Sequence, residues 1–326
     1  MGAEMKSFPQ KLDYRFLISG EMISGRGEDS FYMAQKDHSA LAAVFDGCGG
    51  LGCRRYRNYR GHTGAYMASR AASGALHDWY HVFTGGSKAG GDETAEGICE
   101  YFNEALEVVS GHAGQTPRIF GTMVRDFPTT AAIALVQDTK DGTQLRCFWA
   151  GDSRVYLLDR RGLAQLTVDD VEGEDALSNL RADGALSNVI ASDGRYVLHT
   201  GPAMRFPENE PYAVFAATDG CFGYLQTPMD FEDLLLSCLL ESPSPAQFKH
   251  KLEEDIRAAA GDDYTFAFIS VGYGSYSSLQ EALTERREVL RREYMEPLDR
   301  DSSSRTLARL WEKYRVGYER YLSEKK

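Results

Sequence analysis

Acidic side chains recur in this chain at places where an apolar run ends in a tight turn. One apolar run leads into Asp46-Gly47, and a second leads into Asp219-Gly220. Hard divalent cations bind several oxygen ligands, and glycine lets backbone carbonyls approach them closely. Two strands that each deliver a carboxylate at a turn therefore predict a metal site.

Two further acidic pairs stand beside apolar runs. Asp262-Asp263 precedes the run 266–271, and Glu28-Asp29 precedes the run 31–34. Taken singly, each has an ordinary explanation, because Asp-Gly is a common turn signal and an acid beside a strand usually faces water. Four such places in one chain favour a shared site.

The order of these motifs resembles the PP2C family of metal-dependent protein serine/threonine phosphatases. The resemblance spans about residues 14 to 272, and its most specific piece is Gly151-Asp152-Ser153-Arg154. The motifs in chain order are Glu28-Asp29, Asp46-Gly47-x-Gly49-Gly50, Pro128-Thr129-Thr130-Ala131, Gly151-Asp152-Ser153-Arg154, Asp219-Gly220 and Asp262-Asp263.

The resemblance implies a centre of two Mn²⁺ or Mg²⁺ ions. Asp46 would bridge the ions, and Asp219 with Asp262 would hold one of them. The Gly47 carbonyl and Glu28 would serve the other. Water between the ions would be the nucleophile, because the metals lower its pKa and stabilise charge on the phosphoryl group.

The same resemblance implies roles for two further acids. Asp29 would lie behind the ligands, and Asp152 belongs to a third metal site of the family. Mg²⁺ and Mn²⁺ suit an all-oxygen set, whereas zinc would recruit His or Cys.

Three positions depart from the family pattern. Cys48 stands where many members have a His proposed as general acid, so we assign no acid role there. The phosphate-binding Arg of the family aligns with Ser24, and the nearest candidate is the displaced Arg26, whose guanidinium suits phosphate oxygens. A solvated surface Arg is the alternative for Arg26. Gly223 replaces an Asp that helps hold the third metal, so that site should be weak or absent.

The implied fold is α+β, a central antiparallel β-sandwich flanked by helices and followed by a C-terminal helical extension. Apolar runs independently predict strands at 41–45, 130–136, 145–150, 155–158, 212–217 and 265–271. Helical spacing predicts helices at 65–80, 96–110, 230–240 and 246–260.

A basic segment follows the first glycine turn. Four arginines and two tyrosines lie between Arg54 and Arg60. They suit a phosphopeptide-binding rim, and a solvated charged loop is the alternative. The chain's net charge of -12 argues against nucleic acid as the main partner, because a phosphate backbone needs a broad basic face.

Composition predicts a cytoplasmic protein. No run approaches the ~20 apolar residues of a membrane span, and the N-terminus lacks the apolar region of a signal peptide. The six cysteines are scattered as reduced thiols would be, and their spacing matches neither a disulfide framework nor a zinc site.

The C-terminal part of the chain, which we call the tail, has a different sequence pattern. Residues 1–274 should form the phosphatase domain, and residues 275–326 should form two amphipathic helices. These helices either pack on the domain, which we favour, or dock a partner protein.

The sequence as a whole predicts a protein phosphatase that hydrolyses phosphoserine and phosphothreonine on proteins. A pseudophosphatase that keeps the fold as a binding module is one alternative. A hydrolase of small phosphate esters is another. The acids Asp46, Asp219 and Asp262 favour the enzyme.

Overall fold

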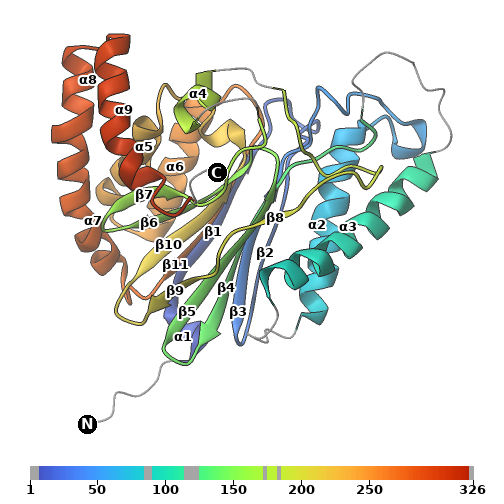
Figure 1. The fold of residues 1–326 in the computed structure, drawn as a ribbon, viewed down its shortest axis with the longest axis horizontal. Helices are drawn as coiled ribbons and strands as arrows, with labels where there is room; N and C mark the ends of the chain where they lie inside the picture. The colour runs from blue at the N-terminus through green and yellow to red at the C-terminus, as the bar shows by residue number, and fades with distance from the viewer. Residues whose placement is uncertain (1–6, 84–89, 114–124, 172–174, 182–184, 323–326) are drawn as a thin grey trace.

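Two antiparallel β-sheets pack face to face in the computed structural model, which describes residues 7–83, 90–113, 125–171, 175–181 and 185–322 (Figure 1). One sheet has the order β1 (Leu12–Gly20), β11 (Tyr264–Val271), β10 (Tyr212–Ala217), β6 (Arg154–Asp159) and β7 (Gly162–Gln165). The other has the order β2 (Ser30–Lys36), β3 (Ser39–Phe45), β4 (Ala131–Thr139), β5 (Gly142–Ala150) and β8 (His199–Thr200), and β9 (Met204–Pro207) also pairs with β5.

The central strands are apolar on both faces because both faces are covered. Val214 of β10 belongs to the core between the sheets, and Phe215 points into the core beneath the helices. In β3, Val44 likewise belongs to the core between the sheets, and Phe45 belongs to the core beneath the helices. Successive side chains of a strand point to opposite faces, so a continuous apolar run marks a strand buried on both sides.

Helices cover the outer face of each sheet (Figure 1). On the six-stranded sheet lie α2 (Gly64–Val82) and α3 (Gly91–Ala113), and on the five-stranded sheet lie α5 (Pro228–Glu241) and α6 (Pro245–Ala259). Thr63, Thr227 and Ser244 cap α2, α5 and α6 by accepting a backbone N–H through the side-chain oxygen. Two short helices, α1 (Phe8–Lys11) and α4 (Ala176–Arg181), complete this part.

The predicted sandwich with flanking helices and a C-terminal helical extension is confirmed. The six strands and four helices expected from the sequence all form, within a few residues of the expected limits. The predicted strands did not include β1 and β2, which are nine and seven residues long, or β7, β8 and β9, which are only two to four residues long.

The C-terminal helices share one core with the five-stranded sheet. α7 (Tyr276–Leu290) continues through a π-helical turn (Arg291–Met295) into α8 (Glu296–Arg300), and α9 (Ser304–Tyr318) follows. Leu283 of α7 and Trp311 of α9 are buried in the same cluster as Phe215 of β10. The tail therefore buries its apolar stripe against the rest of the chain. The domain boundary at residue 274 and a partner for these helices stay predictions.

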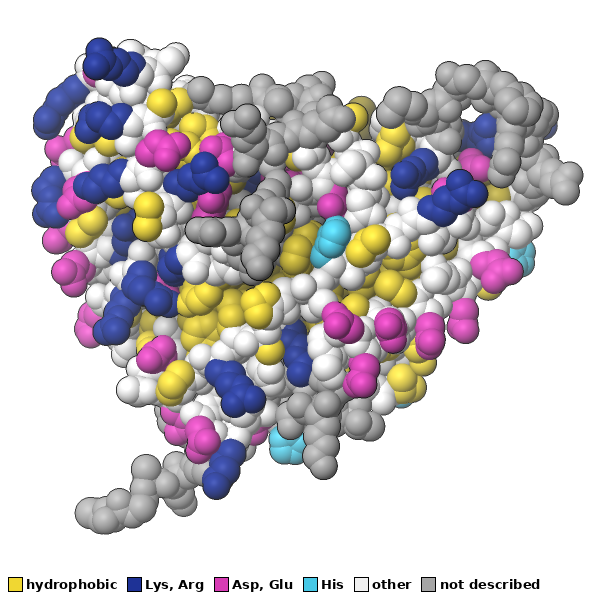
Figure 2. All heavy atoms as spheres, viewed as in Figure 1, with side chains coloured by type: hydrophobic (Ala, Val, Ile, Leu, Met, Phe, Trp, Pro, Cys, Tyr) yellow, Lys and Arg dark blue, Asp and Glu magenta, His cyan; other side chains and the backbone are white. Residues whose placement is uncertain are grey.

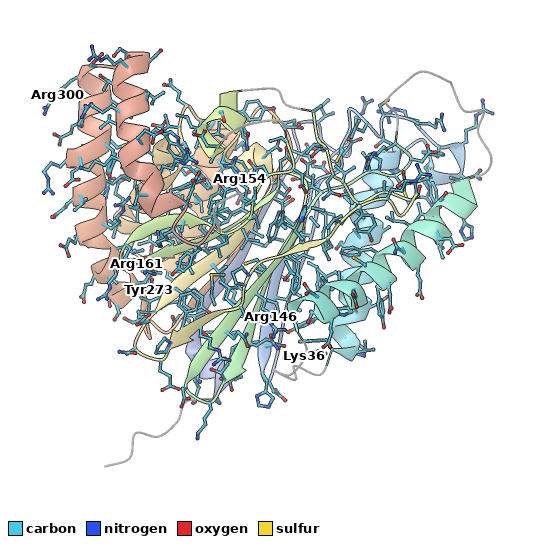
Figure 3. The ribbon with its side chains drawn as sticks, viewed as in Figure 1. Lys36, Arg146, Arg154, Arg161, Tyr273 and Arg300 are labelled. Atoms are coloured by element: carbon cyan, nitrogen blue, oxygen red, sulfur yellow. The ribbon has the colours of Figure 1, made fainter. Side chains whose placement is uncertain are left out.

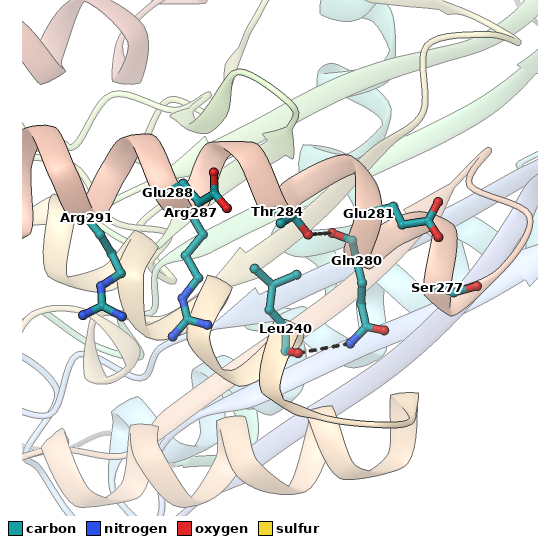
Figure 4. A pocket seen from close by; sticks show the side chains of 8 residues that line it. All are labelled: Leu240, Ser277, Gln280, Glu281, Thr284, Arg287, Glu288 and Arg291. Carbon is teal, nitrogen blue, oxygen red and sulfur yellow. Dashed lines mark hydrogen bonds between the residues drawn. The ribbon is translucent and has the colours of Figure 1, made fainter.

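Gln280 of α7 fastens the tail to the end of α5. Its Nε2 donates to the carbonyl oxygens of Leu239 (3.0 Å) and Ser242 (2.9 Å). The last carbonyls of a helix have no partner within the helix, so this amide satisfies groups that would otherwise need water. An open groove of about 510 Å³ runs beside the contact along α7 (Figure 4).

Within the described ranges, no helix is long and apolar enough to cross a membrane.

Glu232 of α5 is a buried carboxylate that contacts two helices of the tail. Its side chain is 0% exposed and accepts two hydrogen bonds of 2.7 Å from the Arg286 guanidinium. The Tyr314 hydroxyl donates at 2.7 Å, and the Leu163 backbone N–H donates at 2.9 Å. One carboxylate thus connects β7, α5, α7 and α9.

Replacing this carboxylate should loosen the tail. We expect Glu232→Ala to lower the free energy of unfolding by about 3 kcal/mol, because Arg286 would stay partly buried without its partner. Glu241→Ala is the matched control in the same helix, and it should cost at most about 1 kcal/mol because Glu241 pairs with Arg287 at the surface. Urea denaturation of both variants measures the difference, and equal losses would contradict the assignment.

Candidate metal centre

The acidic turns lie together at one end of the sandwich because of strand register. Phe45 at the end of β3 pairs with Ser30 at the start of β2, which brings Asp46 beside the Glu28-Asp29 turn. Ala217 at the end of β10 pairs with Phe266 and with Arg154, which brings Asp219 beside the turns that carry Asp262 and Asp152.

These acids line one pocket of about 510 Å³. The structure brings together six residues that the sequence singled out: Glu28, Asp46, Gly47, Asp152, Asp219 and Asp262. Asp263, the turn 48–51, Ala185 and Leu186 complete the lining. The described lining contains no Lys or Arg, so the pocket is strongly acidic.

The threonines before β4 hold Asp46 in place. Thr130 donates its backbone N–H to the Asp46 carbonyl at 2.8 Å, and the Thr129 hydroxyl donates to the same oxygen at 2.7 Å. The Thr130 hydroxyl accepts the Asp46 N–H at 3.1 Å and lies 2.6 Å from the Ser153 hydroxyl. This motif therefore links the turn of Asp46 to the turn of Asp152.

Glycines let the turns approach each other. A Cβ on Gly220 would lie 1.9 Å from the carbonyl oxygen of Asp263, and one on Gly47 would lie 2.7 Å from the carbonyl oxygens of Glu28 and Ala65. Real Cβ atoms do not approach backbone oxygens so closely. Glycine is therefore required for the acids to share one pocket.

Burial and mutual repulsion dominate the electrostatics of the pocket. Burial, reinforced by Asp219, raises the pKa of Asp46 well above its usual range and the pKa of Asp152 to about 8. Burial also raises the pKa of Asp29 to about 7 and, with the charge of Asp262, raises the pKa of Asp219. Like charges in a low-dielectric site disfavour ionisation unless a cation offsets them.

The donor set fits hard divalent cations. The charges of Asp46 and Asp152 both face that of Asp219, and among the described residues Asp152 Oδ1 is buried with no hydrogen-bond partner. The Cys48 thiol keeps its proton, because burial and the charge of Asp46 raise its pKa well above the usual range. The ligands on offer are therefore oxygens. Among the residues that the structure describes, no three His, Cys, Asp or Glu side chains converge tightly enough to define an ion position on their own.

Two of the predicted residues lie outside the pocket. Asp29 is buried behind it, where Asp29 Oδ2 accepts a hydrogen bond of 2.8 Å from Thr218, while Asp29 Oδ1 has no hydrogen-bond partner among the residues that the structure describes. Arg26 is exposed and is not part of the lining. Its role as a phosphate ligand stays a prediction.

Asp263 and Thr63 position Glu28, and the sequence analysis assigned no role to either. The Asp263 carboxylate accepts the backbone N–H of Met22 at 2.8 Å and that of Glu28 at 2.7 Å. The Thr63 hydroxyl donates to Glu28 Oε1. The doubled acid Asp262-Asp263 was the available signal, since two adjacent carboxylates at a strand start point in different directions.

Arg154 is a buried cation at the start of β6 (Figure 3). Its guanidinium donates to both oxygens of Asp169, at 2.9 and 2.6 Å, and lies 4.4 Å from the ring centroid of Phe222. It also donates to the Tyr318 hydroxyl of α9 at 3.5 Å. Arg154 begins β6 and Phe222 follows the Asp219 turn, so this cation joins two acid-bearing segments to the tail.

Family comparison agrees with this arrangement. A family model described as protein phosphatase 2C matches residues 25–257, which include every acid of the pocket except Asp262 and Asp263. The chain belongs to the protein phosphatase 2C family. It is therefore a metal-dependent protein serine/threonine phosphatase by family, as its motifs predicted. No curated protein matches the sequence.

Solved structures share the fold. A bacterial serine phosphatase aligns with a TM-score of 0.57 and 14% identity, covering 79% of this chain and 97% of that chain. The Mycobacterium tuberculosis serine/threonine phosphatase PstP/Ppp aligns with a TM-score of 0.53 and 19% identity, covering 80% and 98%. The PstP catalytic domain in complex with two manganese ions aligns with a TM-score of 0.51 and 17% identity, also covering 80% and 98%.

Two neighbouring glycines of the pocket test the position of Glu28. A Cβ on Gly49 would lie 2.3 Å from Glu28 Oε2, whereas a Cβ on Gly50 would meet nothing within 4 Å. We expect Gly49→Ala to displace the carboxylate, so that about tenfold more Mn²⁺ is needed for the same thermal stabilisation. Gly50→Ala should leave the Mn²⁺ concentration dependence unchanged. Thermal shift against Mn²⁺ concentration measures both, and identical curves would contradict the role of Glu28.

A pH-dependent ion pair supports the turn of Asp152. Asp170 accepts the Gly151 N–H at 2.9 Å and lies 2.9 Å from His199 Nε2. This hydrogen bond raises the pKa of His199 above its usual value. Because the pKa of His199 is higher in the folded than in the unfolded protein, the ion pair contributes its full stabilisation at pH values below the pKa of the unfolded state. This stabilisation is lost as pH rises through the pKa of the folded state.

The stability lost in His199→Gln should therefore be largest near pH 6 and should shrink above neutral pH. Urea denaturation of wild type and variant between pH 6 and 8.5 measures this difference, in which other titrating groups cancel. A difference that is constant with pH would contradict a charged His199.

Proposed function

We propose that this chain hydrolyses phosphoserine and phosphothreonine on proteins with two Mn²⁺ or Mg²⁺ ions. Asp46 would lie between the ions, Asp219 and Asp262 would hold one, and Glu28 with the Gly47 carbonyl would hold the other. The observation that carries the proposal is the convergence of acids from separate turns in one pocket, where their repulsion favours bound cations. The two manganese ions in the PstP complex support the number of ions.

Bound ions would supply an activated water and would stabilise charge on the phosphoryl group. The chain itself contributes the fixed carboxylates. The threonine clamp on Asp46 and the backbone N–H groups on Asp263 orient the ligands before substrate arrives. Asp152 also lines the pocket, and in the described part of the chain its Oδ1 has no hydrogen-bond partner. It would be a further metal ligand at a third site, which Gly223 leaves one carboxylate short.

The alternatives make different predictions. A pseudophosphatase would keep the fold without turnover, and the presence of Asp46, Asp219 and Asp262 in the pocket favours the enzyme over it. An esterase for small phosphate esters would prefer those esters to phosphopeptides. A cytoplasmic location, a partner at the C-terminal helices and the absence of nucleic-acid partners stay predictions from the sequence.

Hydrolysis of a phosphothreonine peptide tests the function. We expect turnover with Mn²⁺ or Mg²⁺, none with EDTA, and a loss of at least about 100-fold in kcat/KM in Asp219→Asn, because the variant lacks a ligand carboxylate. Asp193→Asn, an exposed acid outside the pocket, is the control and should match wild type. A folded, Mn²⁺-binding protein without turnover would support the pseudophosphatase. Faster turnover of p-nitrophenyl phosphate than of every phosphopeptide would support the esterase.

A further inference from the structure

The basic segment before α2, residues 53–60, is a fixed loop, which we call the arginine loop. Its tyrosines point inward. The Tyr56 ring stacks on Phe127 with ring centroids 4.8 Å apart, and the Tyr59 hydroxyl donates to the Val109 carbonyl of α3 at 2.6 Å. Asn58 Nδ2 donates to the His112 carbonyl at 2.8 Å. These anchors hold the loop against the end of α3.

The arginines of the loop divide into one anchor and three exposed residues. Arg54 pairs with Asp126 at 3.3 Å and is partly buried. Arg55, Arg57 and Arg60 are exposed, and in the described part of the chain none of the three has an ion-pair partner. The loop therefore presents three positive charges on a rigid backbone.

The arginine loop begins at the edge of the acidic pocket. Leu51 still lines the pocket, two residues before the loop starts. The backbone of Arg55 pairs with Thr63, whose hydroxyl donates to Glu28 Oε1. The arginine loop therefore adjoins the wall of the pocket that Glu28 forms.

The charge of the surface around the arginine loop favours one class of ligand. Exposed glutamates follow one another along α3, at Glu96, Glu100, Glu104 and Glu107, and Figure 2 shows a row of acidic side chains over this helix. The whole chain carries a net charge of -12. An acidic peptide is repelled by most of this surface and attracted at the arginine loop. A long polyanion such as nucleic acid would meet the acidic row as well.

We propose that the arginine loop binds acidic side chains next to the phosphorylated residue, so that the enzyme selects phosphorylation sites in acidic sequences. Arg55, whose backbone pairs with Thr63 beside Glu28, would contact residues close to the phosphorylated one, and Arg57 and Arg60 would contact residues further along the substrate peptide. Guanidinium groups suit this role because they donate in pairs to carboxylates. The inference rests on the proposed phosphatase function and adds a substrate class to it.

Paired variants test the proposal. Arg57→Gln/Arg60→Gln removes two charges from the arginine loop and leaves Arg55 beside the pocket. Arg305→Gln/Arg309→Gln removes the same charge from exposed positions of α9, on the opposite side of the molecule (Figure 1). Each protein is assayed with phosphothreonine peptides whose flanking residues are acidic, neutral or basic.

Wild type should prefer the acidic peptide over the neutral one by about three- to tenfold in kcat/KM, mainly through KM, as expected for a few exposed ion pairs. Added salt should reduce the preference, because it screens exposed charges. The loop variant should lose the preference, and the α9 variant should keep it. No preference in wild type, or an unchanged preference in the loop variant, would overturn the proposal.

Failure of the proposed function gives a different result. If no peptide is hydrolysed, the phosphatase proposal fails, and fluorescence anisotropy with the same peptides still tests the loop in Asp219→Asn protein. Tighter binding of the acidic peptide that disappears after Arg57→Gln/Arg60→Gln supports the loop. Equal binding of all peptides, or tighter binding of a single-stranded oligonucleotide through the same arginines, overturns it.

Discussion

Repulsion between carboxylates at one end of the sandwich is the constraint on which the rest of the structure depends. Burial and neighbouring acids raise the pKa values of Asp29, Asp46, Asp152 and Asp219. An acid with a raised folded pKa costs stability as pH rises above its unfolded pKa, so at neutral pH this cluster opposes folding. Divalent cations bound by these acids would offset that cost, so the stability of this end of the sandwich would depend on the metals that the proposed function needs.

The fold meets this constraint with supports from distant parts of the chain. The threonines before β4 clamp Asp46, Asp263 holds the backbone of Glu28, and Arg154 links two acid-bearing segments. Arg154 in turn contacts Tyr318 of α9, so the tail that follows the catalytic region reaches the back of the pocket. The C-terminal helices thereby become part of the scaffold of the site.

The acids that line the pocket could be selected from the sequence because each stands where an apolar run meets a turn, a signal that is local in the chain. Long runs such as that of β10 were predicted for the same reason. β8 has two residues and takes its shape from its neighbour β5, so local pattern could not find it. Glu232 and Arg154 work through partners far away in sequence, which no local spacing reveals. The environment of Arg26 likewise depends on loop geometry.

Calorimetric titration of the chain with Mn²⁺ tests the metal centre without substrate or turnover. We expect two ions bound per chain and a loss of at least about tenfold in affinity in Asp46→Asn, since Asp46 is the proposed ligand of both ions. A chain that binds no Mn²⁺, or that binds it equally well after Asp46→Asn, would contradict the assignment of the acidic pocket as a metal centre.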